Sequence, residues 1–114
     1  MSTAGVPISE LKAELFRALG NPGRIRILET LVQGERSVGD LQPEVGLEAS
    51  HLSQQLGVLR RANLVVARKE GNQVFYMVRS PLMADLLAAA KMLLISSLAD
   101  AQSLLADLSD DAQA

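Results

Sequence analysis

Residues 50–65 read SHLSQQLGVLRRANLV, and this stretch decides how the rest of the chain is interpreted. Leu52, Leu56 and Leu59 recur at i, i+4 and i+7, a spacing that places apolar side chains on one buried side of a helix. Short or planar groups that both donate and accept hydrogen bonds, as contact with base edges in the DNA major groove requires, occupy the other positions. These candidate base-reading residues are Ser50, His51, Ser53, Gln54 and Gln55. An ordinary solvent-exposed helix face has the same pattern, so the flanking segments must separate the two interpretations.

The segment before this helix predicts a shorter helix that begins at Ser37 and reads SVGDLQPEV. Its Leu41 and Val45 are spaced to pack inward. A short helix, a turn and a second helix with a polar outer face form a helix-turn-helix pattern, which places the start of its second helix in the major groove. The pattern favours a recognition helix over a solvated face.

The segment after the helix changes to a periodicity of two. The runs VVARKE and QVFYMV are strand-like, and Gly71-Asn72 between them tolerates the positive φ angles of a tight hairpin turn. A helix-turn-helix followed by a basic hairpin is the arrangement of a winged helix, whose basic side chains contact phosphates on both sides of the reading helix. The candidates for such contacts are Arg60, Arg61, Arg68 and Lys69.

The last part of the chain predicts one long helix over residues 81–108, without Gly or an internal Pro. At ~1.5 Å per residue it spans roughly 40 Å, and its leucines exceed what one narrow stripe needs. Burial against a second copy of the chain is the natural way to cover such a helix. The expected interface residues on it are Leu86, Leu87, Leu93, Leu94, Leu98 and Leu105.

Composition limits the classes of protein that fit. The 114 residues suffice for one domain, residues 1–114, with its core in residues 20–79. The net charge of −2 hides a split, because residues 24–79 carry +2 and residues 80–114 carry −4. The N-terminal residues show no secretory signal, and Asp85 and Lys91 interrupt the apolar run 82–98, which argues against a membrane span. We therefore expect a cytoplasmic protein without a membrane partner.

Enzyme and metal chemistry find little support in the residues. The chain has no cysteine, hence no disulfide and no thiolate metal site, and it lacks a phosphate-binding GxxxxGK loop. His51 is the single histidine, so a metal site around it needs carboxylates or ligands from a second subunit. We predict that the protein is not an enzyme and assign no cofactor.

Two segments resemble the ArsR/SmtB family of bacterial winged-helix repressors. LFRALGNPGRIRILETL is similar to the family pattern xxKALadptRlrIL, and LSQQLGVLRRANLVVARKEGNQVFYMV to vSqHLkvLreaGLV…reGrxvyYxl. The resemblance implies a mainly α winged helix-turn-helix fold with a small β-hairpin, and a homodimer built on helices of about residues 9–19 and 81–108. It also implies a double-stranded operator with inverted-repeat character.

Carried over by position, the resemblance assigns the wing to Arg68, Lys69, Asn72 and Gln73, and Gln55 stands where the family usually has His. It adds Leu11 and Leu15 to the dimer interface, and we expect Arg24 to contact phosphate. A winged-helix module that binds proteins instead of DNA is the alternative that the residues leave open.

The departures from the family pattern concern the residues that bind the metal to which members of the family respond. The family metal box ELCVCDL corresponds here to ERSVGDL, with Ser37 and Gly39 in place of the two cysteines. The last helix contains no His for the other common metal site. The family has nickel-, zinc- and redox-sensing members, cysteine-free actinobacterial ones among them, so the resemblance leaves Ni(II), Zn(II) or a different signal open.

Overall fold

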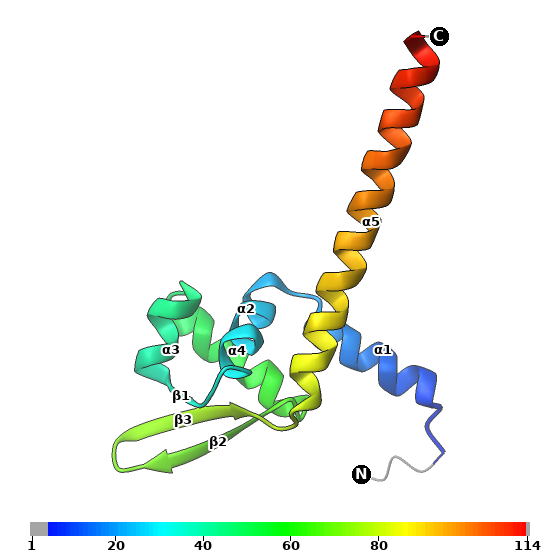
Figure 1. The fold of residues 1–114 in the computed structure, drawn as a ribbon. Coiled ribbons are helices and arrows are strands. Elements are labelled where there is room, and N and C mark those ends of the chain that lie inside the picture. Colours follow the sequence, from blue (N-terminus) through cyan, green and yellow to red (C-terminus); the bar gives the residue numbers. More distant parts are fainter. Residues whose placement is uncertain (1–4, 114) are drawn as a thin grey trace. The chain divides into compact units, whose positions relative to one another are not determined.

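The computed structural model describes residues 5–113 and the side chains of residues 5–110. Helices dominate this part of the chain, and one small antiparallel sheet accompanies them, which confirms the predicted fold class (Figure 1). In chain order the elements are α1 (Ile8–Leu19), α2 (Pro22–Leu31), β1 (Arg36–Ser37), α3 (Val38–Val45), α4 (Ala49–Arg61), β2 (Val65–Glu70), β3 (Gln73–Val78) and α5 (Leu82–Gln113).

Helix α1 begins one residue earlier than its sequence suggests. The helix starts at Ile8, and the carbonyl of Pro7 accepts the backbone N–H groups of Glu10 and Leu11 at 3.0 and 3.3 Å. Proline fixes its own φ and has no N–H to satisfy, so it suits the entry to a helix without a capping side chain.

The junction between α1 and α2 follows the sequence closely. Asn21 caps α2, and its Oδ1 accepts the backbone N–H of Arg24 at 3.1 Å, as predicted. Gly23 is buried there, and a Cβ atom on it would lie 3.1 Å from Asn21 Oδ1 and 3.3 Å from Leu47 Cδ1. A side chain at this position would require the Asn21 and Leu47 side chains to shift by a few tenths of an ångström.

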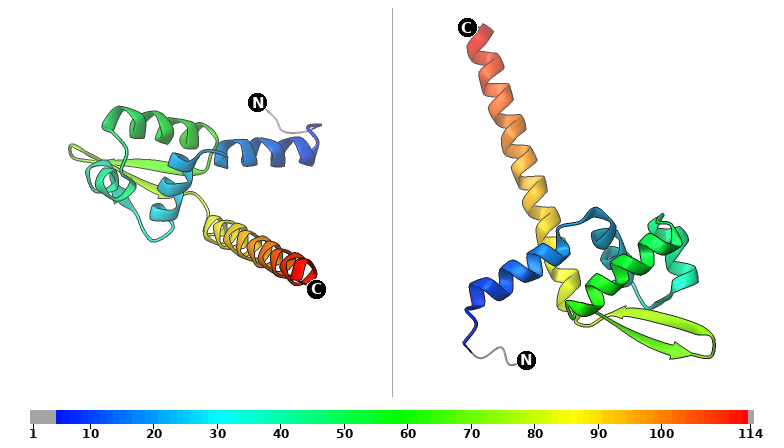
Figure 2. Two further views of the ribbon diagram at one scale, coloured as in Figure 1. Left: turned by 90° about the horizontal axis from the view of Figure 1, so that it is seen from above. Right: turned by 180° about the vertical axis from the view of Figure 1, so that it is seen from behind.

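The core lies among α2, α3, α4 and the sheet. Helix α2 packs against both α3 and α4, and α4 lies along β2, as the two views of Figure 2 show. The largest side chains excluded from solvent are Ile27, Leu28, Leu31, Leu41, Leu52, Leu56, Leu59 and Val65. Burial of each such side chain contributes about 1.5–3 kcal/mol, so the three leucines of α4 hold this helix firmly in place.

The helix-turn-helix is formed by α3 and α4. Ser37 caps α3 as predicted, with its Oγ accepting the backbone N–H of Asp40 at 3.1 Å. The helix ends at Gly46, whose φ of +76° is the left-handed conformation that glycine adopts at helix ends. Helix α4 then begins at Ala49, one residue before the first candidate base-reading residue.

The sheet confirms the predicted hairpin and adds a strand. Strands β2 and β3 pair through a turn at Gly71 and Asn72, where Gly71 has a φ of +61°. The short β1 pairs with the outer edge of β3, giving the order β1-β3-β2. Two residues are too few to show an alternating pattern, which is why the sequence did not indicate β1.

The chain divides into two units, Met1–Met83 and Ala84–Ala114. The second unit consists of the continuation of α5 and has no core of its own, so the prediction of one domain over residues 1–114 stays a prediction. Leu93, Leu94, Leu98 and Leu105 of this helix are 61–71% exposed. Helix α5 runs to residue 113 in the structure, five residues past its predicted end at 108.

Among the described residues, α5 is the one helix long and apolar enough to cross a membrane, with a mean hydropathy of 1.7 in an 18-residue window within residues 82–110. Length and composition alone do not decide between a membrane span and a protein contact, so the absence of a membrane partner stays a prediction. The same length and composition suit a helix that packs against another protein surface.

Candidate nucleic-acid interface

The outer face of α4 carries four of the five predicted base-reading residues. Ser50, His51, Ser53 and Gln54 are all exposed. The opposite face is closed, because Leu52, Leu56 and Leu59 are at most 1% exposed. A rigid helix thus presents uncharged donors and acceptors to solvent, the side-chain chemistry that base edges require.

Gln55 does not belong to this face, which corrects its assignment as a base-reading residue. Its side chain is 7% exposed, because its position three residues after Leu52 and four before Leu59 turns it toward the interior. The Oε1 atom accepts a hydrogen bond from Arg24 Nη1 at 2.8 Å. The Nε2 atom lies 3.1 Å from Nε2 of His51. Both ends of the amide are therefore used within the protein.

Arg24 also differs from its predicted role. Its guanidinium donates to the backbone carbonyls of Ala18 and Arg17 at the end of α1, and to Gln55 on α4. Three of the five N–H donors of an arginine are thus taken by protein acceptors. Its position does not support a phosphate contact, and we assign Arg24 to holding α1, α2 and α4 together.

The end of α4 is basic. Arg60 and Arg61 are exposed, in keeping with phosphate contacts beside the reading face. The guanidinium of Arg61 folds back over the preceding turn, where a Cβ atom added to Gly57 would lie 3.2 Å from its Nη1 atom. The missing side chain at Gly57 therefore leaves room for this arginine along the helix.

The wing carries a basic residue whose charge is already paired. Arg68 Nε donates to both carboxylate oxygens of Glu35 at 3.1 Å, and its Nη1 atom donates to Glu70 at 2.6 Å. The guanidinium also lies 4.6 Å from the ring centroid of Phe75. Hydrogen bonds from Arg68 lower the pKa of Glu35, and hydrogen bonds to Glu35 and then Glu70 raise the pKa of Arg68. These carboxylates therefore compete with a phosphate for the Arg68 guanidinium, whose side chain is 50% exposed.

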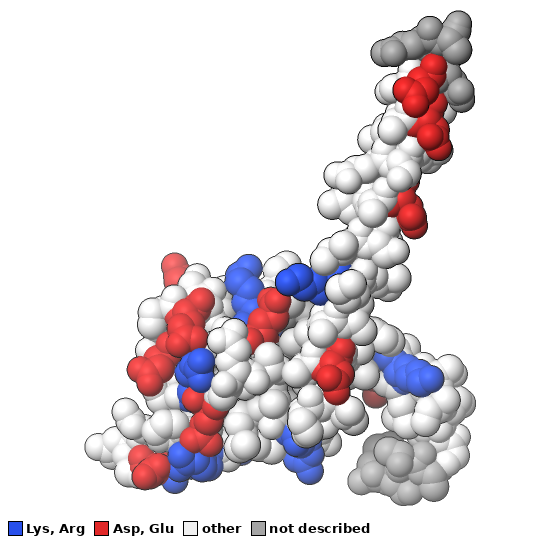
Figure 3. Space-filling view, viewed as in Figure 1, with Lys and Arg blue, Asp and Glu red and all other residues white. Residues whose placement is uncertain are grey.

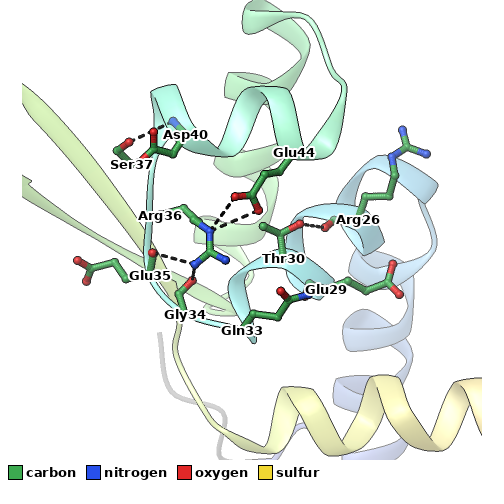
Figure 4. A network of polar contacts seen from close by, with 10 residues as sticks. All are labelled: Arg26, Glu29, Thr30, Gln33, Gly34, Glu35, Arg36, Ser37, Asp40 and Glu44. Atoms are coloured by element: carbon green, nitrogen blue, oxygen red, sulfur yellow. Dashed lines mark hydrogen bonds and ion pairs between the residues drawn. The ribbon is translucent and has the colours of Figure 1, made fainter.

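The loop that carries Glu35 is itself held in place, as Figure 4 shows. Arg36 pairs with Glu44 of α3 at 3.2 Å. Its Nη1 atom donates to the carbonyls of Gly34 and Glu35 at 2.9 and 3.1 Å. Glu35 thus meets the wing from a fixed backbone rather than from a free loop.

The remaining wing residues are open to solvent. Lys69, Asn72 and Gln73 are exposed at the tip of the hairpin. Sequence reasoning missed Glu35, since it lies 33 residues from Arg68. The pairing of Arg68 with Glu70 could be predicted from the sequence, because side chains two residues apart on a strand lie on the same face.

Charges are mixed over the winged-helix unit. On the face shown in Figure 3, acidic and basic side chains lie interspersed rather than in one field. Beyond Lys91, the described charged residues of α5 are all acidic, namely Asp100, Asp107 and Asp110, with uncharged surface between them. This face therefore carries no single basic field.

No group of three or more His, Asp or Glu side chains that could hold an ion is found among the residues with described side chains. At the position of the family's thiolate box, the Ser37 hydroxyl caps α3 and Gly39 has no side chain. These residues do not fit a thiolate-type metal centre.

Comparison with known proteins places this fold in a family. A model described as "Bacterial regulatory protein, arsR family" matches residues 21–66, from the cap of α2 into β2. The HTH-type transcriptional regulator Rv0081 of Mycobacterium tuberculosis is 53% identical over 103 residues, which cover 90% of each chain. The chain belongs to the arsR family.

Solved structures of ArsR-type regulators resemble this chain. The crystal structure of Rv0081 matches with a TM-score of 0.76 and 55% identity, covering 82% of this chain and 95% of that one. The homodimeric winged helix-turn-helix DNA-binding domain Mb0332 of Mycobacterium bovis matches at 0.73 and 30% identity, covering 86% and 91%. The transcriptional repressor BigR of Xylella fastidiosa matches at 0.71 and 38% identity, covering 75% and 87%.

These matches confirm the predicted winged helix-turn-helix fold and the resemblance stated from the sequence. The chain is a cysteine-free ArsR-family transcriptional regulator with relatives in mycobacteria, and its family consists of regulators rather than enzymes. Helices α3 and α4 form the helix-turn-helix, and β2 and β3 form the wing.

Proposed function

We propose that this ArsR-family regulator binds an inverted-repeat operator in double-stranded DNA as a homodimer and reads it with the exposed face of α4. The observation that carries the proposal is the two-sided character of α4. Its inner leucines are fully buried, whereas Ser50, His51, Ser53 and Gln54 are exposed and uncharged. A helix fixed on one side and hydrogen-bonding on the other is suited to the major groove.

Affinity, in this proposal, comes from cations beside the reading face. Arg60 and Arg61 at the end of α4 and Lys69 at the wing are exposed. Each phosphate that such a group neutralises releases counterions, which makes binding sensitive to salt. Asn72 and Gln73 add uncharged contacts at the wing tip.

The homodimer is proposed to form through α1 and α5. The leucines of α5 beyond residue 92 are exposed in the single chain, and burial against a second copy removes them from water. Leu11 and Leu15 of α1, with Leu86 and Leu87 of α5, complete the proposed interface. The Mb0332 domain is described as homodimeric, which supports the assignment. Two-fold symmetry would place the two α4 helices roughly 34 Å apart, one turn of DNA.

The interface has a direct test. Leu94→Glu or Leu98→Glu buries a carboxylate in the proposed contact, which is costly without a partner. We expect monomers in sedimentation velocity and weak operator binding, with far-UV circular dichroism unchanged. A dimer that survives both substitutions would contradict this interface.

The signal is proposed to be something other than a thiolate-bound metal, because Ser37 and Gly39 replace the family's cysteines. A site for Ni(II) or Zn(II) would need His51 together with groups from a second chain. Operator titrations with Ni(II), Zn(II) and oxidants test this point. Release of DNA by a stoichiometric amount of either metal would identify a metal signal bound through His51 or oxygen ligands, and no effect of either metal would indicate a different signal.

The base-reading proposal is tested by selecting an operator from random duplexes and titrating it by fluorescence anisotropy. Gln54→Ala should weaken specific binding by about tenfold and leave binding to random DNA nearly unchanged. Gln33→Ala, an exposed glutamine at the end of α2, is the matched control. Equal losses on both duplexes would contradict base reading.

If no duplex is preferred and salt has no effect, the chain is a protein-interaction module instead. An operator-binding role places the protein with the chromosome in the cytoplasm.

A further inference from the structure

We infer that Arg24 and Gln55 fix the tautomer of His51, so that the histidine presents an N–H donor to DNA and selects a base with an acceptor on its groove edge. This inference rests on the proposed function for its DNA part only. The chain of bonds itself lies within the winged-helix unit and runs from the end of α1, through α2, to the outer face of α4.

The first step concerns the amide of Gln55. An arginine side chain only donates hydrogen bonds, so the atom 2.8 Å from Arg24 Nη1 must be the amide oxygen. That bond fixes which way the amide is turned, a choice that is otherwise ambiguous for glutamine. The NH₂ group of Gln55 therefore faces His51.

The second step concerns the ring of His51. An NH₂ group only donates, and it lies 3.1 Å from Nε2 of His51. Nε2 must then be the bare, accepting nitrogen of a neutral imidazole, which leaves the ring proton on Nδ1. The bond made by one ring nitrogen sets the state of the other. An imidazole in water instead favours the proton on Nε2.

The third step concerns rigidity. Gln55 is 7% exposed, and Arg24 is held by two carbonyls of α1 besides Gln55. Neither group can turn over without leaving a buried polar atom unpaired, which is costly. Among the residues with described side chains, no buried side-chain nitrogen or oxygen lacks a partner. The tautomer of His51 is thus set by the interior of the protein.

The consequence for recognition is a choice of base. A fixed Nδ1–H donates to N7 of a purine, O6 of guanine or O4 of thymine. It is repelled by the amino groups of cytosine and adenine on the same edge. Arg24 and Gln55 are positioning residues in this scheme, and His51 is the residue that contacts DNA.

The tautomer is measured directly by ¹⁵N NMR of the imidazole in the full-length dimer. His51 is the single histidine of the chain, so both imidazole nitrogen signals belong to this residue. On the high-pH plateau of a titration we expect Nδ1 protonated and Nε2 bare in the wild type. A wild-type ring with the proton mainly on Nε2 would overturn the inference.

Gln55→Glu is the decisive variant. It keeps the shape of the side chain and the oxygen that contacts Arg24, but it replaces the NH₂ donor beside His51 by a carboxylate oxygen, which accepts. His51 must then donate from Nε2, and we expect the ring proton to move there. Gln55→Met, which removes both contacts, should give the mixture found in water. Gln33→Met on the exposed end of α2 is the matched control and should leave the wild-type tautomer. An unchanged tautomer in both Gln55 variants would overturn the inference.

The DNA part uses the selected operator with 7-deazapurines, which lack N7, or with 4-thiothymine, which weakens the thymine acceptor, placed one position at a time. The wild type should lose about fivefold in affinity at one position per half-site, the worth of one hydrogen bond. His51→Ala and Gln55→Glu should be insensitive there. Equal sensitivity in all three proteins would overturn base selection by Nδ1.

The two readouts separate the inference from the proposed function. A wild type with Nδ1 protonated but no sequence preference would overturn the base-selection part together with the proposed function, and support the tautomer. A wild type that prefers one operator but carries the Nε2 proton would overturn the inference and leave the proposed function standing.

Discussion

Helix α4 and the wing both face the proposed DNA surface, but their side chains stand in opposite states. The outer groups of α4 are exposed and uncharged, and the helix is held from behind by leucines. In the wing, Arg68 is already bound to Glu35 and Glu70. The polar groups of the reading face are thus exposed, whereas the guanidinium of Arg68 is shared between any phosphate and two carboxylates. Sequence choice and electrostatic attraction are therefore governed by different parts of this small unit.

The largest expected effect comes from removing the support of the reading face. Leu56→Ala leaves a cavity behind α4 and should lower the free energy of unfolding by about 2–5 kcal/mol, a large share of the stability of a small domain. Urea denaturation followed by circular dichroism measures it. Ser53→Ala on the outer face of the same helix should change stability by less than about 0.5 kcal/mol. A loss of similar size from both would mean that α4 is not held by one face.

The next effect separates the two regions by the kind of binding they lose. Lys69→Ala in the wing should weaken binding to all duplexes alike. It should also reduce the steepness of the plot of log affinity against log salt concentration by about 1. Titrations on the selected operator and on random DNA at several salt concentrations measure both quantities. A loss confined to the operator would place base reading in the wing and remove the contrast with α4.

A smaller effect of opposite sign is expected from freeing Arg68. Glu35→Gln removes the charge that holds the Arg68 guanidinium and should raise affinity for random DNA about two- to fivefold at low salt. The slope of log affinity against log salt concentration should become steeper by up to about 1. Glu44 pairs with Arg36 instead of Arg68, so Glu44→Gln makes the same change in net charge and is the control. If both variants gain equally, the effect is one of net charge and not of the Arg68 contact.

The smallest effect concerns pH. Because the pKa of Glu35 is lowered by the hydrogen bonds from Arg68, this contact adds stability above the ordinary glutamate range and loses it as the pH falls through the lowered pKa. Carbon-13 NMR of the carboxyl group follows the titration. Arg68→Ala should raise the pKa of Glu35 toward its ordinary value, and Lys69→Ala should not. A Glu35 pKa unmoved by Arg68→Ala would show that the pair is absent in solution.

The helices and the hairpin could be predicted because their patterns are local. Asn21 and Ser37 cap helices as their neighbours indicate, and Gly71-Asn72 turns the chain between strands. Asn63 adopts a positive φ of 61° at the place where the family pattern has Gly, a conformation that asparagine tolerates. Such features are settled within a few residues of sequence.

The state of the site could not be predicted in the same way. The spacing of Gln55 from Leu52 and Leu59 indicates an inward position, but only the structure shows that its amide accepts a hydrogen bond from Arg24 on α2. Arg68 reads as a free cation, and Glu35 reaches it from a distant loop. In both cases a hydrogen-bonding partner distant in sequence decides which donors and acceptors of the side chain stay free for other contacts.

The bonds of Arg24 have a thermodynamic consequence. The same guanidinium holds the end of α1, which we propose to lie at the subunit contact, and the glutamine behind His51. If assembly of two chains favours the arrangement that reads DNA, then reciprocity requires the operator to strengthen assembly by the same factor. Operator and partner subunit act on one another as effectors, and a molecule that loosens either association weakens both.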